Sequence, residues 1–250
     1  MTTVRPALDA AVRQTIAAQT EALFRSSGAF REGHFQLKSG RHGDAYVEKF
    51  QVLQDPAATS ELCSYLAGRG RGRDGETLVD VVAGPTTGGV ILAFETARQL
   101  GVRGIFAEEV RADDGSMRRE FRRGFRIEPG ERVLLVDDIL TTGGSLLAML
   151  PAVEAMGGEV VECIVLVDRS GGRATLTSPL SGRVYPLRSL WQLDLPTYEP
   201  GTATCPRCTD GTPLHAPGST GTGVGLPGTT AEPTTDATPD APEPPEPAAG

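Results

Sequence analysis

The residues with the clearest capacity for chemistry lie in the stretch 133–146, VLLVDDILTTGGSL. An apolar run ends there on two adjacent acids, Asp137 and Asp138. Adjacent carboxylates repel one another unless a cation or hydrogen-bond donors meet them. Sugar hydroxyls can donate such hydrogen bonds, and a hydrated Mg²⁺ can neutralise the charge. The pair therefore predicts a site for a polyhydroxyl or metal-associated ligand.

The turn after these acids has the composition of an anion-binding loop. Thr141, Thr142 and Ser145 supply hydroxyls, and Gly143 and Gly144 leave the backbone N–H groups accessible where a helix is expected to begin. A helix N-terminus favours a bound anion. The turn lacks the GxxxxGK[ST] and GxGxxG spacings of nucleotide-binding loops. Helix capping would be a sufficient explanation of Asp137 and Asp138 if they stood alone. The strand, the two acids, the small-residue turn and the helix together instead predict binding of a phosphoribosyl group.

A second loop has the same design. The stretch 81–90, VVAGPTTGGV, passes from an apolar run through small residues into a predicted helix, with Thr86 and Thr87 in the loop. Its N–H groups predict a second anion site, suited to pyrophosphate.

The elements that must position these loops alternate between strand and helix. The strand runs are apolar without alternation, which is typical of parallel strands covered on both faces. The order indicates an α/β fold with a doubly wound, mainly parallel sheet, and ligands bind at the carboxyl ends of such strands. The predicted strands are 78–83, 104–107, 132–136 and 160–167, and the predicted helices are 89–100 and 145–156.

The segments outside this core follow different patterns. Helices are expected over 6–28 and from Asp55-Pro56 to about Arg69, with two short strands joined at Ser39-Gly40 between them. Residues 108–130 are long, charged and poorly periodic, which predicts a loop that acts as a lid.

We divide the chain into one domain and a tail. The domain covers 1–215, with a core of about 56–185 and a small hood formed mainly by 30–50 together with 186–215. Residues 216–250 are rich in Pro, Thr and acids, cannot bury enough apolar surface to fold, and are expected to be disordered.

Composition excludes several classes of protein. The formal net charge of the 250 residues is -8, and five of the acids lie after Ala216, where Lys and Arg are absent. This balance argues against a nucleic-acid-binding surface. No apolar run is long enough for a membrane span and the N-terminus does not resemble a secretory signal, so a cytoplasmic protein is expected.

The four cysteines do not suggest a disulfide framework. Cys205-Pro-Arg-Cys208 is half of a zinc-binding pattern, but a structural zinc needs four ligands and only His215 follows closely. Cys63 and Cys163 are expected to be buried thiols, and His34 and His42 to be surface or packing residues. Whether Cys205 and Cys208 bind zinc stays open from the sequence.

VLLVDDILTTGGSL resembles the phosphoribosyl pyrophosphate motif of type I phosphoribosyltransferases. Further segments resemble the orotate phosphoribosyltransferase family, over about residues 10–215. They are FQLKSGRHGDAYV (35–47), VVAGPTTGGVILAFETARQLGVRGIFAEE (81–109), RRGFRIEPGERVLLVDD (122–138) and LVDRSGG (166–172).

The resemblance implies transfer of phosphoribosyl from phosphoribosyl pyrophosphate to orotate, with Mg²⁺, in a homodimer whose lid serves the partner's active site. It implies roles for particular residues. Lys38 contacts orotate and the phosphoribosyl group, Asp137 and Asp138 hold the ribose hydroxyls, 141–145 bind the 5-phosphate, and Thr141 and Arg169 face orotate. Arg169 suits the orotate carboxylate because a guanidinium can hold it with two parallel hydrogen bonds.

The chain departs from the best-known bacterial pattern at two loops. That pattern has an aromatic residue and a lysine where this chain has Thr87 and Gly88, and its lid carries lysines and a histidine, whereas residues 107–130 have only arginines as cations. We expect Arg111, then Arg122 and Arg123, to stabilise pyrophosphate by charge.

Two alternative functions stay open at this point. The same loops suit a phosphoribosyltransferase for another nucleobase. The missing lid lysines are also compatible with a regulator that binds phosphoribosyl pyrophosphate without catalysis.

Overall fold

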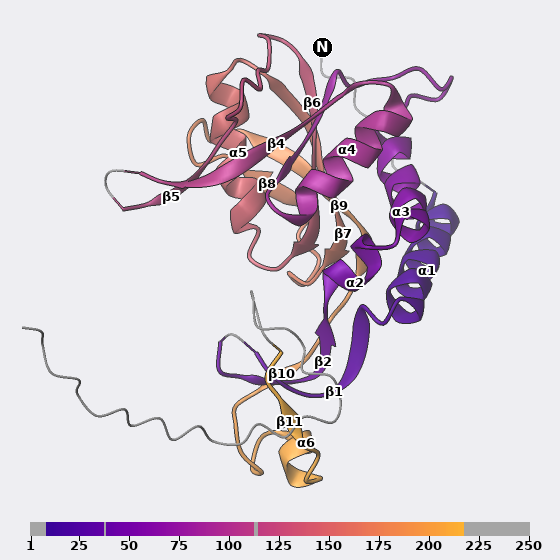
Figure 1. Ribbon diagram of the computed structural model, residues 1–250, viewed down its shortest axis with the longest axis vertical. Helices are drawn as coiled ribbons and strands as arrows, with labels where there is room; N and C mark the ends of the chain where they lie inside the picture. The colour runs from indigo at the N-terminus through magenta and orange to yellow at the C-terminus, as the bar shows by residue number, and fades with distance from the viewer. Residues whose placement is uncertain (1–8, 38, 113–114, 218–250) are drawn as a thin grey trace, which may run out of the picture.

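A seven-stranded sheet forms the centre of the computed structural model, which describes residues 9–37, 39–112 and 115–217 (Figure 1). The strand order is β5-β4-β3-β6-β7-β9-β8. The five inner strands are parallel, and an antiparallel strand flanks each edge. This is the α/β doubly wound arrangement that the sequence predicts. The inner strands are β4 (Arg103–Arg111), β3 (Val81–Pro85), β6 (Arg132–Leu140), β7 (Glu159–Asp168) and β9 (Val184–Gln192).

Three helices cover one face of the sheet, namely α1 (Ala10–Ser26), α3 (Pro56–Arg69) and α4 (Gly88–Leu100). Their apolar side chains meet the sheet in one cluster that includes Phe24 and Trp191, whose ring centroids are 5.8 Å apart. The expected start of α3 is confirmed, because Asp55 Oδ1 accepts hydrogen bonds from the N–H groups of Ala57 and Ala58. None of the described helices is long and apolar enough to cross a membrane.

Helix α5 (Gly144–Ala155) covers the opposite face. Met149, Leu150 and Val153 are fully buried against the second apolar cluster, which is built on the other side of the same strands. The two faces of β6 therefore pack against different helices, α4 on one face and α5 on the other. Pro151 lies within α5, as the sequence predicted.

The prediction of an irregular lid over 108–130 is wrong in its first half. Strand β4 continues to Arg111 and pairs with β5 (Met117–Glu120) as an antiparallel ribbon that projects from the sheet (Figure 1). Both strands of the ribbon consist mainly of charged residues, so the segment showed no apolar periodicity to reveal it.

The hood is a separate four-stranded sheet of order β10-β2-β1-β11. Strand β9 is part of the core sheet, so the C-terminal hood segment begins after Gln192 and not at 186 as predicted. The remaining elements are β1 (Phe30–Gln36), β2 (His42–Val47), α2 (Lys49–Leu53), β8 (Thr175–Thr177), β10 (Thr197–Tyr198), α6 (Pro206–Thr209) and β11 (Leu214–His215).

Candidate active site

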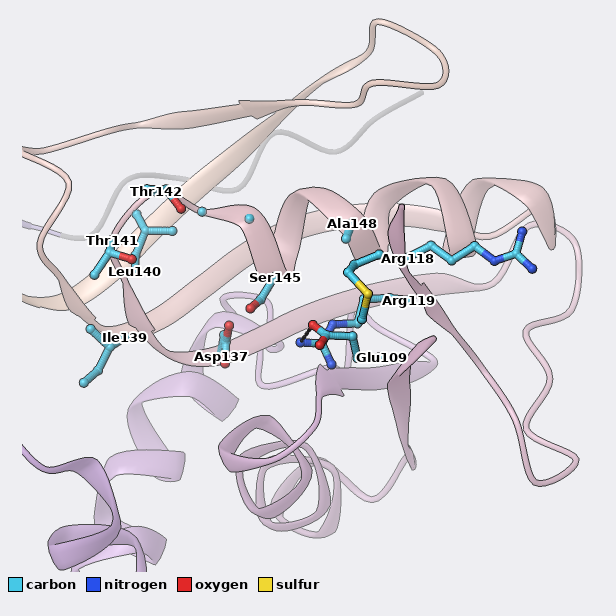
Figure 2. A pocket seen from close by; sticks show the side chains of 13 residues that line it. Glu109, Arg118, Arg119, Asp137, Ile139, Leu140, Thr141, Thr142, Ser145 and Ala148 are labelled. Carbon is cyan, nitrogen blue, oxygen red and sulfur yellow. Dashed lines mark ion pairs between the residues drawn. The ribbon is translucent and has the colours of Figure 1, made fainter. Parts of the chain in front are cut away.

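The two acids of β6 point to opposite faces of the sheet, because side chains alternate along a strand. Asp137 is 8% exposed and lines a cavity of about 390 Å³ on the α5 side (Figure 2). Asp138 is 3% exposed and does not line this cavity. The sequence predicted one joint role for the pair, whereas the fold gives each acid its own surroundings.

The turn after β6 forms one wall of the same cavity. Thr141, Thr142, Gly143, Gly144 and Ser145 all line it, and Figure 2 shows Thr141, Thr142 and Ser145 there. Gly143 has a φ of +84°, which favours glycine, and places the turn at the start of α5. No side chain caps this helix. Its first N–H groups therefore suit an anion in the cavity.

Asp138 lies beside a lysine that the sequence analysis missed. Lys49 Nζ, at the start of α2, is 2.7 Å from Asp138 Oδ2. A Cβ atom on Gly88, the first residue of α4, would lie only 1.9 Å from the same oxygen, so a side chain there would collide with Asp138. Lys49 thus supplies a cation to Asp138 from α2. Lys49 lies at the end of the stretch in which two short strands were predicted, and nothing in its sequence surroundings indicated the contact with Asp138.

Arg119 of β5 forms the opposite wall. Its side chain is 8% exposed, and its Nη1 donates a 2.9 Å hydrogen bond to Thr86 Oγ1. Its Nη2 lies 3.3 Å from Glu109 Oε2, the ion pair dashed in Figure 2. The ribbon thus joins the Thr86 loop to the cavity. Sequence reasoning did not single out Arg119 among the lid arginines, because the pairing of β5 with β4 decides which arginine faces inward.

The lid arginines preferred from the sequence lie elsewhere. Arg111, Arg122 and Arg123 are exposed and do not line the cavity. Arg122 pairs with Glu120, and Arg123 pairs with Glu108. Since the family resemblance implies that the lid acts across a dimer, their roles stay predictions. Lys38 lies outside the described residues.

Arg169 follows β7 and is held in place by its backbone, whose N–H donates a 2.7 Å hydrogen bond to the Leu140 carbonyl. Its Nε is buried and has no hydrogen-bond partner among the described residues. Burial lowers the pKa of the guanidinium, and the nearby Tyr46 partly offsets this. An unpartnered buried donor is costly, which suits a side chain that binds an anionic ligand.

Burial, together with the charge of Asp138, raises the pKa of Asp137 to about 7. Lys49 and Arg119 act in the opposite direction. A ligand that brings hydroxyl donors or a cation to Asp137 would favour its charged form.

This pKa predicts how stability depends on pH. Between about pH 4 and pH 7, folded Asp137 keeps a proton that the unfolded chain releases, so its contribution to stability falls as the pH rises through that window. Asp137→Asn removes this effect. Its melting temperature, measured without ligands, should exceed that of the unaltered protein most at about pH 8, and the gap should narrow towards about pH 5. A gap independent of pH would contradict this.

The comparisons with known proteins agree with this geometry. Residues 56–179 match the phosphoribosyl transferase domain. The orotate phosphoribosyltransferase of Mycobacterium tuberculosis H37Rv superposes with a TM-score of 0.53 at 25% identity, over 71% of this chain and 96% of that one. The Aeropyrum pernix enzyme of the same name gives 0.53 at 26% identity, over 69% and 92%. Fold and site thus define a protein of the type I phosphoribosyltransferase class.

Curated relatives narrow the class. The orotate phosphoribosyltransferase of Caldicellulosiruptor bescii is 43% identical over 197 residues, which cover 79% of this chain and 94% of the relative. That of Pelotomaculum thermopropionicum is 44% identical over 198 residues, 79% and 95% of the two chains. The chain belongs to the orotate phosphoribosyltransferase family.

Proposed function

We propose that this protein transfers the phosphoribosyl group of 5-phosphoribosyl 1-pyrophosphate to orotate. The products are orotidine 5-monophosphate and pyrophosphate, and the reaction belongs to pyrimidine (UMP) biosynthesis. The observation that carries the proposal is the cavity between Asp137, the turn 141–145 and Arg119. It offers a sugar-binding carboxylate next to a phosphate-binding turn, as a phosphoribosyl group requires.

Each part of the substrate has a proposed partner. The N–H groups and hydroxyls of 141–145 bind the 5-phosphate, and Asp137 accepts hydrogen bonds from the ribose hydroxyls. Asp138 faces the loop that carries Thr86 and Thr87, which binds pyrophosphate. Thr141 and Arg169 hold orotate, with the buried Nε of Arg169 directed to its carboxylate.

The cavity fits Mg²⁺ at Asp137, because this buried carboxylate lines it and its raised pKa would fall beside a cation. Asp137 would hold the ion mainly through water and substrate. When bound, it would neutralise charge on the pyrophosphate and ribose oxygens.

The reaction replaces one bond at C1 of the sugar. N1 of orotate forms the new bond as the bond to the pyrophosphate oxygen breaks, and the sugar becomes cationic in between. The protein contributes mainly by positioning and charge. Asp137 stabilises the cationic sugar, while Arg119 and the cationic lid stabilise the leaving pyrophosphate in a site closed to water.

A homodimer is part of the same proposal. The ribbon β4–β5 projects from the sheet, and lid residues Arg111, Arg122 and Arg123 would then stabilise pyrophosphate in the partner's cavity. A cytoplasmic location also belongs to the proposal.

The direct test follows orotate absorbance in the presence of Mg²⁺ and phosphoribosyl pyrophosphate, with a panel of other nucleobases in parallel. The proposal predicts that orotate is consumed and that the other nucleobases are not. Turnover of another base would support a different phosphoribosyltransferase, and binding of phosphoribosyl pyrophosphate without any turnover would support a regulator.

Arg169→Gln is expected to raise KM for orotate about 10- to 100-fold, because one charged hydrogen-bonded partner of a carboxylate contributes about 1.5–3 kcal/mol. The KM for phosphoribosyl pyrophosphate should change little. Steady-state kinetics with each substrate varied in turn checks this. Arg98→Gln is the matched control, because Arg98 is exposed on α4, pairs with Glu95 and does not line the cavity. An equal effect on both KM values would contradict the assignment.

A further inference from the structure

Four potential metal ligands meet in the hood, away from the cavity described above. They are His34 of β1, His42 of β2, Cys205, which directly precedes the short helix α6, and Cys208 within that helix. Their ligand atoms all lie within 4.8 Å of one another. His34, His42 and Cys205 are buried, at 2%, 6% and 1% exposed, and Cys208 is half-buried. Nothing in the proposed transfer reaction uses this cluster.

Three sulfur–nitrogen distances within the cluster match the edges of a tetrahedron around zinc. Zn–S bonds of about 2.3 Å and Zn–N bonds of about 2.0–2.1 Å place neighbouring S and N ligands about 3.5 Å apart. The Sγ atoms of Cys205 and Cys208 lie 3.5 and 3.6 Å from His34 Nε2. Cys208 Sγ lies 3.3 Å from His42 Nδ1. The two ring nitrogens are 2.8 Å apart, slightly closer than two ligands of one ion.

The hydrogen bonding of His34 prepares it as a ligand. Its Nδ1 lies 2.8 Å from the Thr212 carbonyl, which can only accept, so Nδ1 carries the proton. Nε2 then presents its lone pair to the two sulfurs and to His42. A backbone carbonyl in this position is the usual outer partner of a metal-bound histidine, since it fixes the tautomer and the ring orientation.

We propose that His34, His42, Cys205 and Cys208 bind one structural zinc ion. Two thiolates and two imidazoles form a closed Cys₂His₂ set, and this combination of ligands selects zinc over the oxygen-preferring Mg²⁺. The sequence concealed the site because the CxxC pair and the histidines are more than 160 residues apart.

The ion would join the N-terminal segment of the hood, which contains β1 and β2, to its C-terminal segment, which contains α6 and β11. Among the described residues, strand β11 pairs with β1 at two positions, His34↔Leu214 and Phe35↔His215, and the buried apolar side chains of β1 and β2 are Phe35, Ala45 and Val47. Small units of this kind need a metal or another cross-link for stability. His34 and His42 also stand on either side of the β1–β2 turn, so zinc would hold both ends of that turn and anchor the C-terminal segment to it.

Metal analysis of the full chain, purified without chelator, tests the proposal. We expect about one zinc ion per chain. After exchange to Co²⁺, the protein should show the strong visible bands of a tetrahedral site and a near-ultraviolet thiolate-to-cobalt band. Less than about a tenth of a zinc ion per chain, with no such Co²⁺ spectrum, would overturn it.

Variants locate the ligands. Cys208→Ser and His42→Gln should lose the zinc, whereas Cys63→Ser, which alters a buried thiol of the core, and His215→Gln, which alters the exposed histidine of β11, should keep it. Loss of zinc from His215→Gln with retention in His42→Gln would refute the assigned set. The Co²⁺ spectrum of the unaltered protein decides the matter if a ligand variant does not fold.

Discussion

Asp137→Asn is expected to lower kcat/KM for phosphoribosyl transfer about 100- to 1000-fold, the usual cost of removing one preorganised charge from the transition state. Asn keeps the shape and one acceptor oxygen but loses the negative charge. Asp137 is the better test of the two acids, because it lines the cavity, whereas Asp138 also pairs with Lys49 and its loss would disturb α2. Steady-state kinetics at about pH 8, above the raised pKa of Asp137, gives the measurement.

Asp55→Asn is the matched control for this change. It makes the same replacement of a carboxylate by an amide at the N-cap of α3, where Asn caps equally well. Its kcat/KM should stay within about twofold of the unaltered protein. If Asp137→Asn kept full activity while Asp55→Asn also did, the proposed role of Asp137 in holding the sugar would be wrong.

The second large effect concerns stability. Arg69→Met is expected to lower the free energy of unfolding by about 3–5 kcal/mol, because it leaves a buried carboxylate without its main partner. Arg69 Nε and Nη2 each donate a 2.8 Å hydrogen bond to Glu162, and the two side chains are 9% and 3% exposed. Arg188, whose Nε lies 3.6 Å from Glu162, compensates for only part of the charge. Urea unfolding measures the change.

Asp80→Asn provides the comparison, since Arg132 and Asp80 also form a two-point pair but are 40% and 38% exposed. Its loss should cost about 1 kcal/mol or less. An equal loss of unfolding free energy in the two variants would show that burial does not determine how much these ion pairs stabilise the protein. The pair Arg69–Glu162 joins α3 to β7, so its loss should also loosen the layer of helices on that face.

Local sequence determined most core strands and helices and the turn of the proposed phosphoribosyl site. Apolar runs of strand length, Asp55-Pro56 before α3 and the glycines at the start of α5 act on neighbouring residues, so their effects can be read along the chain. The position of Asp137 beside 141–145 also follows from the sequence, because the turn directly follows the end of the strand that carries Asp137.

Only the tertiary structure decided the contacts between distant segments. Alternation along β6 separated Asp137 from Asp138, the pairing of β5 with β4 turned Arg119 inward, and the packing of α2 brought Lys49 to Asp138. The pairing of β11 with β1 brought Cys205 and Cys208 to His34 and His42. Such contacts depend on how whole elements pack, and no periodicity or spacing within one segment records which distant side chains will face it.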